Sequence, residues 1–165
     1  MSIYCPVLDH KVTYIHCQDC DGDCRKTSKK DNNDTAANPD DSVFYCIVAG
    51  GRDFDDYELM KRKLDSILSK QIKVVIISGH ANGADKLGER YAKEKGHELI
   101  IVPAEWQLYG KRAGYLRNRR MHMIASQHKK RGCVCFWDGR SKGTAQNFEI
   151  AKEYDVQLKV IRYKK

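Results

Sequence analysis

The chain has 165 residues, of which 41% are hydrophobic, so it is long enough and apolar enough to form one ordinary domain with a small appendage. It has no apolar run of membrane-spanning length, and its first residues lack the pattern of a signal peptide, so we expect a soluble cytoplasmic protein rather than a membrane or secreted one. Seven cysteines, an odd number, argue against a disulfide framework.

The net charge of +8 is unevenly distributed along the chain. Residues 1–42 contain 5 Lys/Arg and 8 Asp/Glu, whereas residues 43–165 contain 25 and 14. The larger part is therefore strongly basic and favours an anionic partner, either a phosphorylated small molecule or a nucleic acid.

Residues 1–25 have the spacing of a metal site. Four cysteines follow the pattern C-x11-C-x2-C-x3-C, namely Cys5, Cys17, Cys20 and Cys24. A C-x-x-C pair can hold one tetrahedral zinc ion from a single turn, and the two flanking thiolates can complete a closed site, with His10 or His16 as alternative ligands. Because the segment has few apolar residues, the metal would supply most of its folding free energy. We predict a structural zinc, the alternative being a cysteine-bearing leader without fixed structure.

Residues 26–42 are polar, contain no large apolar side chain and are predicted to be a linker. From residue 43 to 165 the hydrophobic periodicity alternates between strand and helix. The first strand begins at Val43 and ends at a pair of glycines, and the later strands are expected at 73–78, 99–104, 133–137 and 157–163. Helices are expected at 55–69, 83–96, 113–128 and 143–154. Apolar strands joined by helical crossovers predict an α/β domain with an open five-stranded parallel sheet and helices on both faces.

The loop after the first strand contains Gly50, Gly51, Arg52 and Asp53. In an open α/β sheet, ligands bind beyond the carboxyl ends of the strands, where glycines let backbone N–H groups approach a phosphate. The guanidinium group of Arg52 would add a positive charge and paired N–H donors to such a site. The alternative is a turn in which the glycines serve only the backbone.

The loop after the second strand has a similar composition, with Ser78, Gly79, Gly83 and Asp85. It is a second candidate for binding a phosphate or a ribose. Asp85 could equally be an acidic residue that stabilises the start of a helix.

The third strand leads to Trp106, which could stack on a base, although a place in the core is slightly favoured. The segment 111–131 then carries eight basic residues and no acidic one, which is usually a solvated face. Arg117 and Asn118 lie early in the third helix of the domain, where an arginine can fold back over a bound phosphate.

The loop after the fourth strand is the second strongest candidate for an anion site. Its candidate residues are Asp138, Gly139, Ser141, Gly143 and Thr144. A serine, a glycine and a threonine at a helix start expose unpaired N–H groups and hydroxyls toward a phosphate.

Four ordered motifs together resemble a known family. They are V-A-G-G-R-D-F at 48–54, S-G-x-x-x-G-A-D at 78–85, A-G-Y-x-R-N at 113–118 and F-W-D-G-x-S-x-G-T at 136–144. Over roughly residues 43–163 the chain resembles the YspA/YpsA-related branch of the SLOG superfamily, whose Rossmann-like domains also include the Smf/DprA and Lonely Guy proteins. The resemblance implies the strand order 3-2-1-4-5, counted from Val43, and a nucleotide or nucleotide-derived ligand.

With that resemblance, several candidate residues acquire an expected role. Gly50, Gly51 and the Gly143-Thr144 pair would cradle phosphates, and Arg52 and Arg117 would neutralise them. Asp85 or Asp138 would accept hydrogen bonds from ribose hydroxyls. A homo-oligomer is also expected, because related domains often self-associate.

The chain departs from the Lonely Guy pattern at one position. Those enzymes resemble P-G-G-x-G-T-x-x-E, with a catalytic glutamate, whereas here Asn147 occupies that place. Hydrolysis of an N-glycosidic or related bond of a nucleotide is therefore an alternative that would need Asp53, Asp85 or Glu105 instead. Binding of single-stranded nucleic acid through the basic helix is the third alternative.

Overall fold

A computed structural model describes residues 2–5, 10–13 and 42–164. The chain divides into two units, Met1–Ala36 and Ala37–Lys165. In the first unit, β1 (Ser2–Cys5) and β2 (His10–Thr13) form an antiparallel pair that the hydrophobic pattern did not predict. Most of the predicted linker 26–42 lies outside the described residues.

The predicted zinc site falls largely outside the described residues as well, since Cys17, Cys20, Cys24 and His16 are not among them. The register of the hairpin pairs Cys5 with His10, so two of the proposed ligand positions lie opposite each other. Within the described ranges, no group of three or more His, Cys, Asp or Glu residues could hold a metal ion. The zinc site therefore stays a prediction.

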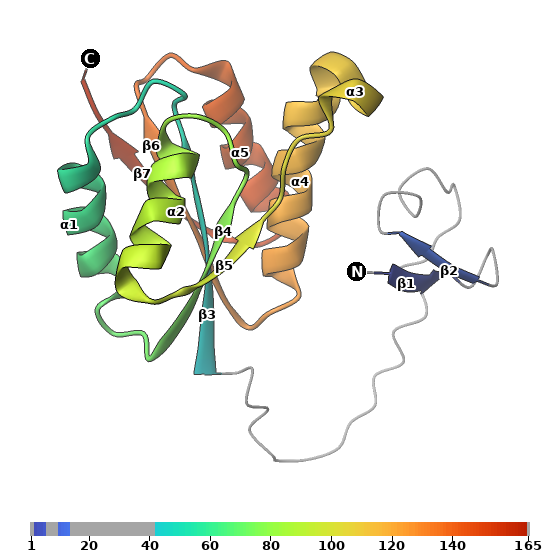
Figure 1. Cartoon of the computed structure of the whole chain (residues 1–165), viewed down its shortest axis with the longest axis horizontal. Coiled ribbons are helices and arrows are strands. Elements are labelled where there is room, and N and C mark those ends of the chain that lie inside the picture. The colour runs from blue at the N-terminus through green and yellow to red at the C-terminus, as the bar shows by residue number, and fades with distance from the viewer. Residues whose placement is uncertain (1, 6–9, 14–41, 165) are drawn as a thin grey trace. The chain divides into compact units, whose positions relative to one another are not determined.

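The second unit is built on a parallel sheet. Its strands are β3 (Val43–Gly50), β4 (Lys73–Ser78), β5 (Glu98–Ile101), β6 (Lys130–Trp137) and β7 (Gln157–Arg162). They are ordered β5-β4-β3-β6-β7, and every neighbouring pair is parallel (Figure 1). This confirms the expected order 3-2-1-4-5 and the α/β, Rossmann-like fold.

The helices cover both faces of this sheet. They are α1 (Tyr57–Leu68) and α2 (Ala84–Lys95), and α4 (Ala113–Ser126) and α5 (Lys142–Glu153). The short helix α3 (Trp106–Tyr109) and a 3-10 turn at Gly110–Arg112 belong to neither core cluster. Side chains of α1 and α2 form one core cluster with Cys46, Val48 and Ile76, and those of α4 and α5 form another with Ile47 and Ile77. Because neighbouring residues of β3 point to opposite faces, its continuous apolar run supplies both clusters.

The largest differences from the predicted boundaries lie around β5 and at the start of β6. β5 ends at Ile101 rather than at residue 104, and the segment predicted as a loop up to Arg112 contains α3 and the 3-10 turn. β6 begins at Lys130, three residues before its apolar run, because these polar residues continue the ladder with β3.

The topology determines where a ligand can bind. From the central β3 the chain crosses to β4 on one side, and it later returns to β6 on the other side. The loops that follow β3 and β6 therefore lie next to each other, and the N–H of Gly51 donates a hydrogen bond to the Phe136 carbonyl oxygen at 3.0 Å. In the part of the chain that is described, no helix combines the length and the apolar character required to cross a membrane.

Candidate functional site

A cavity of about 890 Å³ opens at the carboxyl ends of β3 and β6, a volume in the range of small-molecule sites. Of the predicted site residues it is lined by Gly50, Gly51, Arg52, Asp53, Asp85, Arg117, Asn118, Asp138, Ser141, Gly143 and Thr144. Four predicted residues do not line it: Ser78, Gly79, Gly83 and Gly139. The structure thus brings together residues from four separate segments of the sequence.

The turn after β3 packs closely against the backbone of β6 and against the Tyr163 side chain. A Cβ atom at Gly50 would overlap with the Phe136 carbonyl oxygen, and one at Gly51 would overlap with the Tyr163 hydroxyl. The N–H of Gly51 is already donated to Phe136, and its carbonyl oxygen accepts the N–H of Ala84 at 3.1 Å. These glycines therefore allow two loops to pack tightly, and Gly51 has no N–H left for a phosphate.

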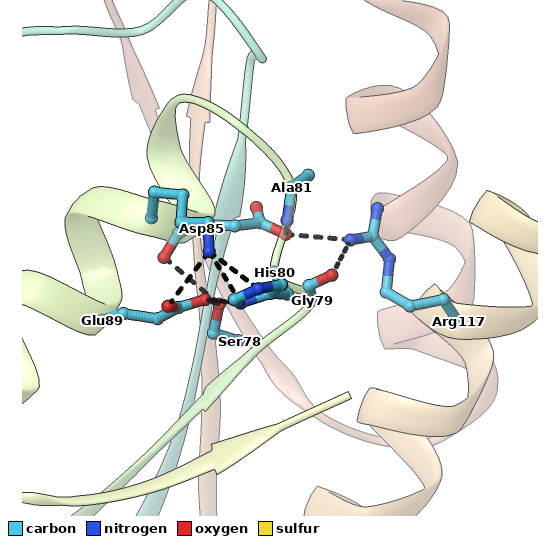
Figure 2. A network of polar contacts seen from close by, with 8 residues as sticks. Ser78, Gly79, His80, Ala81, Asp85, Glu89 and Arg117 are labelled. Carbon is cyan, nitrogen blue, oxygen red and sulfur yellow. Dashed lines mark hydrogen bonds and ion pairs between the residues drawn. The ribbon is translucent and has the colours of Figure 1, made fainter. Parts of the chain in front are cut away.

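The loop after β4 is held from inside the domain (Figure 2). Gly83 has φ +77°, and a Cβ atom there would overlap with the backbone of Gly51 and Arg52. Ser78 is fully buried, and its hydroxyl donates a hydrogen bond to Glu89 Oε1 at 2.9 Å. Both residues therefore fix the loop behind the cavity wall, which explains why neither reaches the cavity.

A buried ion pair joins this loop to α4 (Figure 2). Arg117 Nη1 donates to Asp85 Oδ2 at 3.0 Å and to the Gly79 carbonyl oxygen at 2.6 Å. The side chains of Arg117 and Asp85 are only 11% and 3% exposed. Burial raises the pKa of Asp85 to about 6, although the charge of Arg117 and the N–H groups of Ala81 and Gly50 favour the ionised form. The two charges neutralise each other, and the pair is used within the protein, although the buried Arg117 Nε has no partner among the described residues.

The loop between β6 and α5 is arranged differently. Asp138 Oδ1 accepts the N–H groups of Arg140 at 2.9 Å and Ser141 at 2.8 Å, which lowers the pKa of Asp138. Ser141 is the N-cap of α5, and its Oγ accepts the N–H of Thr144 at 3.4 Å. The N–H groups of Lys142 and Gly143, in the first turn of this helix, have no intrahelical acceptor. They carry the positive end of the helix dipole, which attracts anions.

The floor of the cavity is neutral and polar. Asn118 on α4 and Asn147 on α5 both line the cavity and are 5% and 3% exposed. The Oδ1 atoms of both residues are buried and have no hydrogen-bond partner among the described residues. Leaving such a group unpaired costs about 1–3 kcal/mol, and both side chains line the cavity, so Asn118 and Asn147 are candidates for contact with a ligand.

His122 lies behind this floor and is fully buried. Within the described part of the chain neither of its ring nitrogens has a hydrogen-bond partner that meets the distance and angle limits. Burial lowers the pKa of His122 to about 4, and the nearby Asn147 side chain opposes the shift only in part. The imidazole is therefore neutral at physiological pH.

The rim of the cavity is cationic and aromatic. Lys111, Arg112 and Arg52 line it, and the Arg52 guanidinium lies 5.5 Å from the centre of the Trp106 ring. The slightly favoured prediction that Trp106 belongs to the core is wrong: Trp106 is 50% exposed, because no residue of α3 is buried. Its place at the rim agrees with the alternative that it stacks on a base.

Most arginines of the basic segment 111–131 have carboxylate partners inside the domain. Arg119 pairs with Glu153 at 2.7 Å, and Arg131 pairs with Asp155 at 2.8 Å. Arg120 lies 3.9 Å from Glu105. The segment therefore offers less free positive charge to a nucleic acid than its composition indicates, and nucleic-acid binding stays an untested prediction.

Several lining residues were not among the predicted ones: Ala49, Ala81, Trp106, Lys111, Arg112, Gly114, Tyr115, Gln146 and Asn147. The spacing of residues on one side of a helix could have identified two of them. Gln146 and Asn147 lie three and four residues after Gly143, on the same side of α5.

The fold and the cavity define an α/β domain with a ligand site at the switch point of a parallel sheet. A sequence model of the "YspA, cpYpsA-related SLOG family" matches residues 45–109, from within β3 to the end of α3. The Gene 61 protein of Mycobacterium phage D29 is 30% identical over 118 residues, which cover 68% of this chain and 91% of the phage protein. The chain therefore belongs to the YspA/cpYpsA-related SLOG family, which confirms the resemblance and, at a coarse level, a domain that binds nucleotide-related ligands.

Proposed function

We propose that the cavity binds a nucleotide or a nucleotide-derived ligand, with its phosphate at the start of α5. The observation that carries this proposal is the pairing of a helix N-terminus with a cationic rim in one cavity of about 890 Å³. The N–H groups of Lys142 and Gly143 are oriented for a phosphate by the helix itself. Arg52, Lys111 and Arg112 provide positive charge from the opposite segments.

The rest of the ligand would extend toward the aromatic rim. Trp106 presents half of its surface to solvent, and every nucleobase has a face that can stack on such a ring. Because Arg52 lies over the same ring, it could contact a phosphate while Trp106 holds the base. This arrangement supports a nucleotide more strongly than a simple phosphate.

The test is a thermal-shift and calorimetric screen of the full chain against nucleotides, NAD, ADP-ribose and inorganic phosphate. A ligand at about one hundred times its Kd stabilises the native state by about 2.7 kcal/mol and raises the melting temperature measurably. We expect Arg52→Ala to weaken nucleotide binding by about 10- to 100-fold, because a hydrogen bond to a charged group contributes about 1.5–3 kcal/mol.

The matched control is Arg62→Ala, which removes the same charge from an exposed position of α1 that does not line the cavity. It should leave binding unchanged. Equal loss in the two variants would indicate a general effect of charge, and unchanged affinity in Arg52→Ala would contradict the assignment of Arg52.

We propose hydrolysis of an N-glycosidic bond as the second candidate function, because Asp85 lines the cavity and has a pKa raised to about 6. A carboxyl group with a pKa near the working pH can act as a general acid or base. Analysis of each bound nucleotide after incubation separates the two functions. An intact ligand supports a binding or sensor domain, whereas release of the free base supports the hydrolase.

A further inference from the structure

We propose that Asn118 and Asn147 form a ribose subsite, which makes the cavity selective for ribonucleotides over deoxyribonucleotides; this rests on the proposed nucleotide-binding function. The two amides come from different helices, α4 and α5, and meet in the same cavity. Each is at least nine-tenths buried, and each has a buried Oδ1 atom without a partner among the described residues.

The chemistry of this pair favours an uncharged hydroxyl group. Both side chains are neutral, and His122 behind them is held neutral by burial, so the floor has no formal charge to offer a phosphate or an ammonium group. A hydroxyl both donates and accepts hydrogen bonds, so it can pair with an amide whichever of its two ends points into the cavity. The exocyclic group of a base is a donor or an acceptor but not both, and would fit only one orientation.

The position of the pair also suits a sugar. Asn147 lies four residues after Gly143 on the same side of α5, which corresponds to a rise of about 6 Å from the helix start where the phosphate is proposed to bind. In a nucleoside 5′-phosphate the sugar is the group next to the phosphate, and the edge of the base lies farther away. A ligand with its phosphate at the start of α5 would therefore bring its sugar to the amides before its base.

The carboxylates predicted to accept ribose hydroxyls are already engaged. Asp85 is bound by Arg117 at 3.0 Å, and Asp138 Oδ1 accepts two N–H groups of its own loop. The Oδ1 atoms of Asn118 and Asn147 have no hydrogen-bond partner among the residues that the structure describes, although the Asn147 side chain lies near enough to His122 to raise the pKa of that imidazole slightly. Because the contacts of Asp85 and of Asp138 Oδ1 are made within the protein, we assign the role expected of an aspartate to the two asparagines.

The decisive experiment measures the affinity of the full chain for the four ribonucleoside 5′-monophosphates and for their 2′-deoxy counterparts. We expect the ribonucleotide to bind about tenfold more tightly whichever base it carries, because the deoxy ligand leaves a buried amide unpaired. Asn118→Ala and Asn147→Ala should each lower this ratio toward one, mainly by weakening the ribonucleotide. Gln157→Ala, which removes an amide from an exposed position of β7 that does not line the cavity, should leave the ratio unchanged.

Equal affinity of the wild-type protein for each ribo and deoxy pair would overturn the ribose subsite and leave the proposed nucleotide binding intact. A preserved ratio in both asparagine variants would overturn the assignment to these residues. Failure of every nucleotide to bind would instead reject the proposed function, and the subsite with it. The comparison of ligands on the wild-type protein tests the subsite even where a variant does not fold.

Discussion

The two sides of the cavity differ in how their polar groups are satisfied. On one side, Asp85 and Arg117, with Gly79 and Gly83 behind them, form what we call the closed wall. Its backbone contacts and its buried ion pair engage Asp85 Oδ2 and Arg117 Nη1, and among the described residues only Arg117 Nε of this wall is buried without a partner. On the other side, the first turn of α5 together with Asn118 and Asn147 forms the open wall, where N–H groups and amide oxygens lack partners among the described residues.

The difference shows which residues give shape and which are available for recognition. Polar groups that satisfy one another inside a protein stabilise one geometry and have little to offer a ligand. Groups that remain unpaired while buried are costly and become useful only when something binds. We therefore expect substitutions in the closed wall to change mainly stability, and substitutions in the open wall to change mainly binding.

The largest effect is expected from Asp85→Ala, which breaks the closed wall. This change leaves the buried Arg117 guanidinium without its carboxylate, and breaking a buried ion pair by removing one partner costs about 3–5 kcal/mol. Chemical denaturation at neutral pH measures the loss. Adding Arg117→Met to Asp85→Ala should recover much of it, because the unpaired charge is then removed as well.

Glu98→Ala is the matched control for this ion pair. Glu98 pairs with Lys73 at 2.8 Å, but the two side chains are 62% and 52% exposed, so the loss should be below about 1 kcal/mol. A cost of that small size for Asp85→Ala too would show that the closed wall is not held by its ion pair.

A smaller effect, which depends on pH, is expected from His122 behind the open wall. Its pKa falls from 6.5 to about 4 on folding, so the unfolded chain takes up a proton before the native protein does. This contribution to stability is fully present above pH 6.5 and is lost as the pH falls through about 4, amounting to about 3 kcal/mol over that window. His122→Leu should remove this part of the acid sensitivity.

Asp85 titrates in the same pH range, but its contribution to stability changes with pH in the opposite direction. Its pKa is raised from an ordinary value of 3.8 to about 6, so its contribution to stability is present below pH 3.8 and is lost as the pH rises through about 6. The measurement therefore compares wild type with His122→Leu by denaturation at each pH, because the Asp85 contribution is common to both proteins. A difference in stability that does not change between pH 7 and pH 4 would contradict a neutral buried His122.

The fold could be predicted from the sequence because its signals are local and repeated. Apolar strands such as 73–78, bounded by helical patterns, predicted the parallel sheet, and β4 has the predicted bounds. The strands β1 and β2 and the helix α3 were missed; each has only four residues, which are too few for a period to be recognised.

The site could be predicted only in part, because residue types do not reveal which of their hydrogen bonds are already made. Gly51 was expected to cradle a phosphate, but its N–H is donated to Phe136, a residue far away in the sequence. Asn147 entered the sequence analysis only as a missing glutamate, whereas in the structure it is a buried amide at the cavity floor. Both facts depend on long-range packing, which a single sequence does not contain.

The smallest effect is expected from the N-cap residues of two helices, α5 and α1, and it distinguishes a loss of stability from a loss of binding. Ser141 caps α5 beside the cavity, and Asp56 caps α1 away from it by accepting the N–H of Leu59 at 2.8 Å. Replacing either cap with alanine should cost about 1 kcal/mol of stability, because each leaves a helix N–H without its acceptor. Only Ser141→Ala should also weaken phosphate or nucleotide binding, since it loosens the turn that presents the N–H groups of Lys142 and Gly143. Calorimetric titration of both variants tests this, and equal affinities would mean that the start of α5 does not hold the phosphate.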